Sequence, residues 1–266
     1  MRGIKAEGGW SVVCTEEVEI HHSSEHSPVI EGRMWDDRDI KYFECMVEKV
    51  HNHGALAGFQ PVYSGYTTAN LYSREIPLAP INMPVEEHHP VQARAMDKED
   101  IRNLRKWHLN AVRRAKKSGF DIIYDYLGHG LSIQMHFLSR RLNHRIDEYG
   151  GSLENRLRLF KEILYETKEA VGDTCAVAIR FPVDELIGGQ GITCDGEARD
   201  IIEMLADVPD VWDINLSDWA NDSMSSRFSE QGYQLPYTKF VKDVTKKPVV
   251  GVGRFTSPDT MVSLIK

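Results

Sequence analysis

The sequence lacks a long apolar segment. None of its hydrophobic runs approaches the ~20 residues that a helix needs to cross a bilayer. Residues 1–5 do not form the hydrophobic core of a secretion signal either. A cytoplasmic protein with no membrane partner is therefore expected. The composition, with 41% hydrophobic and 27% charged residues, is typical of one globular domain.

Positive charge is scarce as well. Lys and Arg total 32 against 40 Asp and Glu, which gives a formal net charge of -8. No local cluster of Lys and Arg reverses this sign. Because a negative surface repels a phosphate backbone, nucleic acid is not an expected partner.

Cysteine is sparse and scattered. The four cysteines are far apart and form no Cys-x-x-Cys pair, so their spacing does not indicate a metal site. No metal is expected. Buried free thiols are the expected state of Cys14, Cys45, Cys175 and Cys194.

Short apolar runs alternate with longer helical repeats, which is typical of βαβ units. The apolar repeat at three- and four-residue spacing predicts a helix over 153–171 with Ser152 as N-cap. A second helix is expected over 97–118, and Ser257 followed by Pro258 predicts the start of another. Six strands are expected, at 11–20, 55–63, 121–126, 176–181, 211–216 and 248–252.

Two stretches do not fit the alternation. Residues 64–95 hold most of the prolines and several histidines, and so long an irregular stretch predicts a lid or a substrate-facing segment. The first residues form a charged, glycine-containing segment that leads straight into the first strand. Six parallel strands are two too few for a (β/α)8 barrel, so the pattern alone favours an incomplete barrel and an open doubly wound sheet equally.

In a parallel barrel the reactive groups follow the carboxyl ends of the strands. Tyr126 and His129 place a phenol and an imidazole three residues apart at one such end. They are candidates for proton transfer. The alternative is a core tyrosine followed by a histidine that caps the next short helix.

Two further strands carry polar residues near their ends. Arg180 interrupts an apolar strand, and a buried guanidinium needs an anionic or electron-rich partner. A structural ion pair is the alternative for Arg180. The amide of Gln60 offers one donor group and one acceptor, which suits a heterocycle.

The last two candidate regions lie in loops after strands. Gly253 and Arg254 lie between a strand and a helix start, where backbone N–H groups can bind an anion. In eight-stranded barrels this region forms half of a common phosphate site. Trp219 and Asp222 follow the strand at 211–216, where the indole either packs on the surface or faces a cationic ligand.

Residues 143–156, with the sequence NHRIDEYGGSLENR, resemble the long signature that follows the fourth strand in the old yellow enzyme family. Similarity continues at 5–10, 54–58 and 248–254. The resemblance implies an FMN-binding α/β TIM barrel. Strands two to seven would lie within 1–266, and the first and eighth strands would be lacking.

Tyr126 with His129, together with Trp219 and Asp222, is similar to the trimethylamine and dimethylamine dehydrogenase branch and related N-demethylases. This similarity implies oxidation of a secondary or tertiary methylated amine, with a catalytic triad of Tyr126, His129 and Asp222. Leu131 stands where ene-reductases carry a proton-donating tyrosine. An NAD(P)H-dependent ene-reductase or an inactive barrel fragment remains the alternative.

The resemblance also implies roles for the other candidates. Trp219 would belong to an aromatic bowl around the amine, and Glu17 stands where that bowl has another aromatic residue. Gln60 and Arg180 would contact the flavin ring, with Gly253 and Arg254 also binding the cofactor. A [4Fe-4S] cluster would need ligands from a longer chain, since 1–266 contains none. The electron acceptor is unspecified, and a homo-oligomer is compatible with the sequence.

Overall fold

The computed structural model describes residues 1–25, 31–86, 89–219 and 227–265. The chain divides into two compact units. Unit 1 comprises Met1–Tyr126 with Leu131–Ala178, and unit 2 comprises Leu127–Gly130 with Ile179–Lys266. Each unit is described by itself, and the single domain expected over 1–266 stays a prediction. Among the described helices, none combines the length and the apolar character needed to span a membrane.

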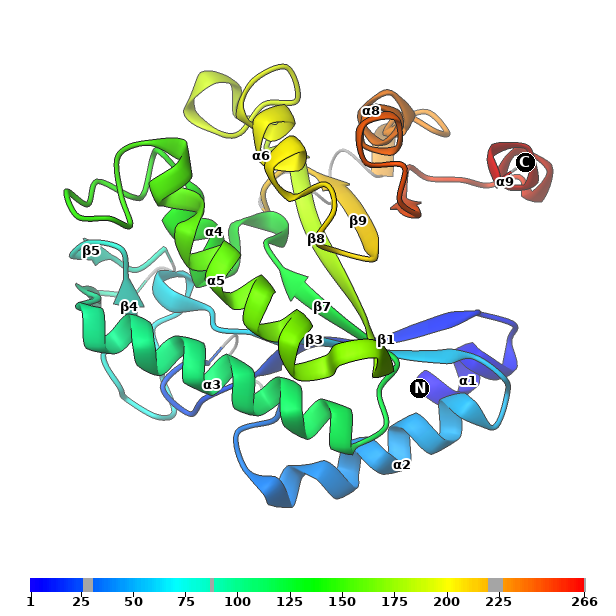
Figure 1. The fold of residues 1–266 in the computed structure, drawn as a ribbon, viewed down its shortest axis with the longest axis horizontal. Coiled ribbons are helices and arrows are strands. Elements are labelled where there is room, and N and C mark those ends of the chain that lie inside the picture. The colour runs from blue at the N-terminus through cyan, green and yellow to red at the C-terminus, as the bar shows by residue number, and fades with distance from the viewer. Residues whose placement is uncertain (26–30, 87–88, 220–226, 266) are drawn as a thin grey trace. The chain divides into compact units, whose positions relative to one another are not determined.

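The six expected strands are confirmed, and they lie in sequential order (Figure 1). The strand order across the sheet is β10-β9-β8-β7-β3-β1-β2, and the main-sheet pairs with an assigned register are parallel. Apart from the two-residue β2 at its edge, this order is that of six successive strands of a (β/α)8 barrel, here not closed among the described residues. The strands are β1 (Val12–Glu19), β2 (Gly32–Arg33), β3 (Leu56–Val62), β7 (Ile122–Tyr126), β8 (Ala176–Asp184), β9 (Val211–Leu216) and β10 (Val249–Gly251).

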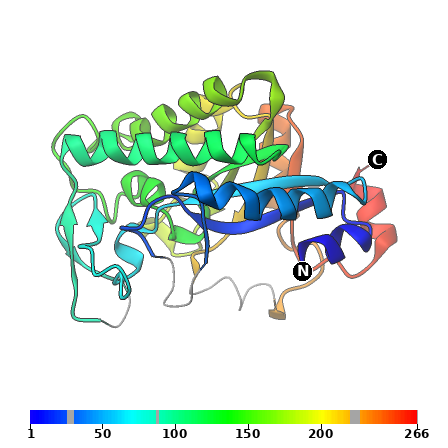
Figure 2. The same cartoon turned by 90° about the horizontal axis from the view of Figure 1, so that it is seen from below.

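Helices connect the strands in both units. In unit 1, α2, α3 and α5 run beside the strands (Figure 2). Ser152 caps α5 as predicted, since its hydroxyl accepts from the backbone N–H of Asn155. The helices are α1 (Arg2–Glu7), α2 (Ile40–His51), α3 (Lys98–Lys117), α4 (Ile133–Leu138), α5 (Leu153–Val171), α6 (Glu197–Leu205), α8 (Leu235–Thr245) and α9 (Pro258–Ile265). Short 3-10 turns are η1 (Asp37–Asp39), η2 (Gly65–Thr67), η3 (Gly128–Gly130), η4 (Gly172–Thr174) and η5 (Gly188–Gln190).

Two stretches expected to lack regular structure contain it, while the lid or substrate-facing role of residues 64–95 stays a prediction. The opening segment contains α1, whose six residues are too few to show a helical repeat in the sequence. Residues 64–95 contain a three-stranded sheet in the order β4-β6-β5, built from β4 (Leu78–Ala79), β5 (Met83–Pro84) and β6 (Gln92–Ala95). This small sheet packs on a cluster of buried side chains, namely Tyr66, Ala69, Ala79, Val85, Ala93 and Leu142.

The cysteine expectation is correct only in part. All four thiols are free, but Cys175 alone is buried. Cys45 is exposed on α2, and the other two are half-buried. The general tendency of cysteine to be buried therefore did not predict individual positions.

The signature at 143–156 forms a structural junction in unit 1. Asn143 donates from Nδ2 to two backbone carbonyl groups, at 2.6 and 2.7 Å. Arg145 pairs with Asp147 and also donates to two backbone carbonyls at the small sheet and before α3. A Cβ at Gly150 would lie 2.2 Å from the carbonyl oxygen of Arg145, so only glycine fits there. The residues that carry the family resemblance thus hold the loop between α4 and α5 in place.

Gly58 on β3 marks a close approach between three neighbouring strands. A Cβ at this position would lie 2.6 Å from Sγ of Cys14 on β1 and 2.9 Å from Cε2 of Tyr124 on β7. Both distances are shorter than carbon contacts allow. The thiol and the phenol ring therefore already fill the space above Gly58.

We expect Gly58→Ala to lower the free energy of unfolding by about 1–3 kcal/mol, because the new methyl group overpacks this layer. Urea titration of the purified protein measures the change. Gly189→Ala is the matched control, since a Cβ there meets no atom within 4 Å and its φ is not in the left-handed region. Equal losses in the two variants would contradict the packing described for Gly58.

Candidate functional site

In unit 1, Glu17 and Gln60 are register partners on the neighbouring strands β1 and β3. Paired residues of parallel strands project from the same face, so the carboxyl and carboxamide groups leave the sheet side by side. A register shift between Cys14 and Glu17 accompanies a positive φ of 74° at Glu16. Gln60 is 4% exposed, and Glu17 is half-buried. Two of the predicted residues therefore share one strand face.

Tyr126 ends β7 and is completely buried. Its side chain packs with Val62 and Leu131. The backbone carbonyl of Tyr126 accepts from Oγ of Ser132 at 2.8 Å, and the same Ser132 caps α4. The sequence alternative in which His129 caps the next helix is therefore wrong, because Ser132 fills that role.

In unit 2, His129 occupies a strained turn. It lies in η3 with φ 55° and ψ 15°, a left-handed conformation that is unfavourable for a residue with a side chain. The imidazole is 7% exposed. Nδ2 of Asn215 lies 3.1 Å from its Nδ1 and 3.4 Å from its Nε2. The Trp219 ring meets it edge-on, with centroids 6.1 Å apart.

Strand β9 has one apolar face and one polar face. Trp212, Ile214 and Leu216 are 0–1% exposed, Asp213 and Asn215 lie between them, and Ser217 follows directly after the strand. Sequence reasoning missed Asn215. The strict polar alternation at 213, 215 and 217 within an apolar strand is the signal that could have found it.

The polar face of β9 carries groups with unused hydrogen-bonding capacity. Oδ1 of Asn215 and Oγ of Ser217 are buried without a hydrogen-bond partner among the described residues. Ser217 also has a positive φ of 65°. Unsatisfied buried atoms and left-handed residues cost stability, and they concentrate at functional sites.

Arg180 lies opposite Asp213 in unit 2. Its Nε is 3.9 Å from Oδ2 of Asp213, at the limit of an ion pair. Burial raises the pKa of the Asp213 carboxyl, and the nearby guanidinium offsets part of that rise. The structural ion pair considered for Arg180 is thus present but long.

The region of Gly253 and Arg254 is held by internal contacts. Arg254 donates from Nη1 to a backbone carbonyl of the preceding loop at 2.8 Å. Oε1 of Gln231 accepts from the backbone N–H groups of Thr256 and Ser257, at 2.6 and 2.9 Å. The amides ahead of α9 are therefore already engaged by a side chain.

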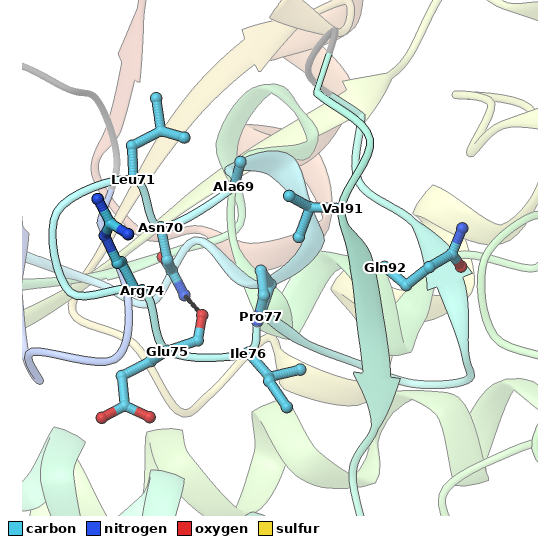
Figure 3. A pocket seen from close by; sticks show the side chains of 9 residues that line it. All are labelled: Ala69, Asn70, Leu71, Arg74, Glu75, Ile76, Pro77, Val91 and Gln92. Atoms are coloured by element: carbon cyan, nitrogen blue, oxygen red, sulfur yellow. Dashed lines mark hydrogen bonds between the residues drawn. The ribbon is translucent and has the colours of Figure 1, made fainter.

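The remaining predicted residue, Asp222, lies outside the described residues. The described part of the chain contains no group of three His, Cys, Asp or Glu side chains suited to a metal ion. A pocket of ≈ 350 Å³ in unit 1 is bordered by Asn70, Arg74 and Ile76, among others (Figure 3). None of the predicted site residues lines it, so it is separate from the candidate site.

The strand ends of unit 2 suit the polar edge of a flavin. Arg180 supplies a cation, while Asn215 and Ser217 supply an acceptor and a hydroxyl that lack partners among the described residues. A flavin ring carries carbonyl oxygens and ring nitrogens that need such partners. The residues present therefore fit FMN.

We expect the free energy of unfolding to fall as pH rises from about 3.8 through the raised pKa of Asp213, because the folded state holds this proton more tightly than the unfolded state. Asp213→Asn should remove this pH dependence, so the free energy of unfolding of the variant increases relative to that of the parent as pH rises. Urea titrations at intervals of about one pH unit between pH 4 and pH 7 test the difference. Asp207→Asn makes the same change at an exposed position and is the control. A variant that runs parallel to its parent would refute the assignment.

Comparison with known proteins gives consistent matches. The chain is 34% identical over 279 residues to dimethylamine dehydrogenase of Hyphomicrobium sp., with 100% of this chain and 37% of that protein covered. Among solved structures, 6-hydroxypseudooxynicotine amine oxidase of Pseudomonas geniculata N1 matches with a TM-score of 0.96 and 50% identity over 99% of this chain and 40% of that one. Histamine dehydrogenase of Rhizobium sp. 4-9 matches with a TM-score of 0.93 and 50% identity over 99% and 38%.

This chain spans about two fifths of the length of these relatives. The barrel fold expected from the signature is confirmed by the two structures. The sequence matches one family over residues 2–266. The chain belongs to the FMN-binding NADH:flavin oxidoreductase / NADH oxidase family.

Proposed function

We propose that the protein containing this chain oxidises a secondary or tertiary methylated amine. The observation that carries the proposal is the grouping in unit 2 of a buried imidazole, held by an amide, with an indole ring edge beside it. The three relatives described above are named for amine oxidation or dehydrogenation, which supports the substrate class. Within the class of amines, the proposed substrate carries a methyl group on its nitrogen.

The reaction removes two electrons and one proton from a methyl group and its nitrogen, which leaves an iminium. Water adds to the iminium and releases an aldehyde and the shortened amine. FMN, when bound, supplies the acceptor for the two electrons. Only the neutral amine has the lone pair that the oxidation requires, so the protein must control one proton at nitrogen.

The proton-handling group is assigned to Tyr126, His129 and Asp222. His129 is buried and oriented, which suits a residue that exchanges hydrogen bonds with substrate. Tyr126 is fixed by packing at the end of β7. A buried group that is already oriented loses little free energy to reorganisation during the reaction.

Substrate recognition is assigned to Trp219 and Glu17. The indole of Trp219 is 64% exposed and can offer its face to a cationic nitrogen. Glu17 adds a carboxylate where the amine dehydrogenases have an aromatic residue, so it favours an amine with a further polar or charged group. Gln60 and Arg180 are proposed to hold the flavin ring, and Gly253 and Arg254 to lie near its phosphate.

The position that would donate a proton in ene-reduction is occupied by a packed apolar side chain. Leu131 is 8% exposed and contacts Tyr126 and Val62. A leucine has no proton to donate, so reduction of an enone lacks its acid at this point. Amine oxidation is therefore favoured over the ene-reductase alternative.

We expect a methylated amine such as dimethylamine, mixed anaerobically with the FMN-loaded protein, to bleach the flavin, whereas NADPH should not. His129→Gln should slow this bleaching by at least about 100-fold, since it removes a group that exchanges protons. His144→Gln changes an exposed histidine of the signature and should leave the rate unchanged. Bleaching by NADPH alone would establish the ene-reductase alternative, and loss of FMN during purification would favour the inactive fragment.

We expect Trp219→Leu to raise the amine concentration needed for half-maximal bleaching by about 3- to 30-fold, the range of one cation–π contact. Trp219→Phe should retain part of the affinity, because it keeps an aromatic face. Stopped-flow titration with the amine measures both values. Trp10 is equally exposed, at 65%, so Trp10→Leu is the matched control. An unchanged midpoint in Trp219→Leu would exclude this residue from the binding site.

A further inference from the structure

The contact between Asn215 and His129 restricts which imidazole nitrogen carries the proton. Nδ2 of Asn215 can only donate hydrogen bonds. Its nearer contact on the ring is Nδ1, at 3.1 Å, while Nε2 lies at 3.4 Å. A nitrogen that accepts a hydrogen bond must keep its lone pair. The ring proton of neutral His129 is then on Nε2.

The surroundings make this contact specific. Asn215 is 4% exposed and His129 is 7% exposed, so bulk water does not compete freely for either group. Asn215 projects from a strand whose alternate residues are fixed in the core, which limits the movement of its amide. The left-handed turn at His129 sets the backbone from which the ring projects. The two elements thus place the amide donor against the imidazole, nearer to Nδ1 than to Nε2.

The geometry points to Asn215 as a positioning residue that holds His129 in the Nε2–H tautomer. This inference rests on the proposed function for its catalytic meaning. In the resting protein His129 then presents a hydrogen-bond donor at Nε2, because its Nδ1 lone pair is taken by the amide. His129 accordingly enters the reaction as a donor toward substrate or a neighbouring oxygen, and another group or the solvent takes up the amine proton.

A substitution at position 215 changes the hydrogen bonding of His129 in addition to the local packing. An aspartate of the same shape could only accept, so it would draw the ring proton to Nδ1 and favour the imidazolium. A leucine of similar size would remove the amide donor from the side of Nδ1. Either change would alter where the proton lies even where the fold is unaffected.

Nitrogen-15 NMR of histidine-labelled, FMN-loaded protein reads the tautomer directly, without any substrate. The His129 resonances are identified by their loss in His129→Gln. We expect the Nε2–H pattern in the parent, a shift of the proton to Nδ1 in Asn215→Asp, and a smaller Nε2–H population in Asn215→Leu. Asn52→Asp introduces the same charge at an exposed position and should leave the parent pattern unchanged. An Nδ1–H pattern in the parent, or no change in Asn215→Asp, would overturn the inference.

Anaerobic flavin reduction by the amine supplies the second arm. Asn215→Leu should slow bleaching by at least about tenfold, because part of the population carries the wrong tautomer. A changed tautomer with an unchanged rate would overturn the positioning role. If no amine bleaches the parent, the proposed function fails, while the NMR result still decides the tautomer. The two failures are therefore distinguishable.

Discussion

A β-strand sends successive side chains to opposite faces, and in β9 this constraint separates packing from chemistry. Trp212, Ile214 and Leu216 fill the core on one face. The other face is left for Asp213, Asn215 and Ser217, two of which contact Arg180 and His129. Because a shift of one residue would exchange the two faces, the apolar residues fix the register that the polar ones need. The chemistry of unit 2 therefore depends on core packing a few ångströms away.

The family signature at residues 143–156 lies in unit 1, where its role is structural. Asn143, Arg145 and Gly150 satisfy backbone carbonyls and allow a close backbone approach in unit 1. A junction of this kind tolerates few substitutions, since each polar group has a defined partner and the glycine position excludes a Cβ. Recognition of the family thus came from residues that build the scaffold. Function had to be inferred from shorter and less specific patterns at strand ends.

Sequence reasoning predicted elements whose local signals were complete. The helix at 153–171 was placed to the residue because its apolar repeat and its cap agree, and β9 was placed equally well. Helix α1 and the small sheet at 78–95 were missed, because two- to six-residue elements show no periodicity and owe their order to tertiary contacts. Among the site residues, His129 and Trp219 lie in contact in the structure, and Glu17 and Gln60 are register partners on neighbouring strands. Asn215 was overlooked because an asparagine inside a strand has no motif of its own. Its role is evident only from its contact with His129.

The amide of Gln231 reaches across 25 residues of sequence to the backbone ahead of α9. Most helices begin with a cap from an adjacent residue, so they can form wherever their own segment is intact. Here Oγ of Ser257 accepts from the backbone N–H of Thr260 at 3.5 Å, and Gln231 adds a contact from a distant loop. The turn around Gln231 and the first residues of α9 are thereby linked by hydrogen bonds that span 25 residues of sequence, so a substitution at Gln231 would loosen the segment ahead of the helix while leaving its local cap in place.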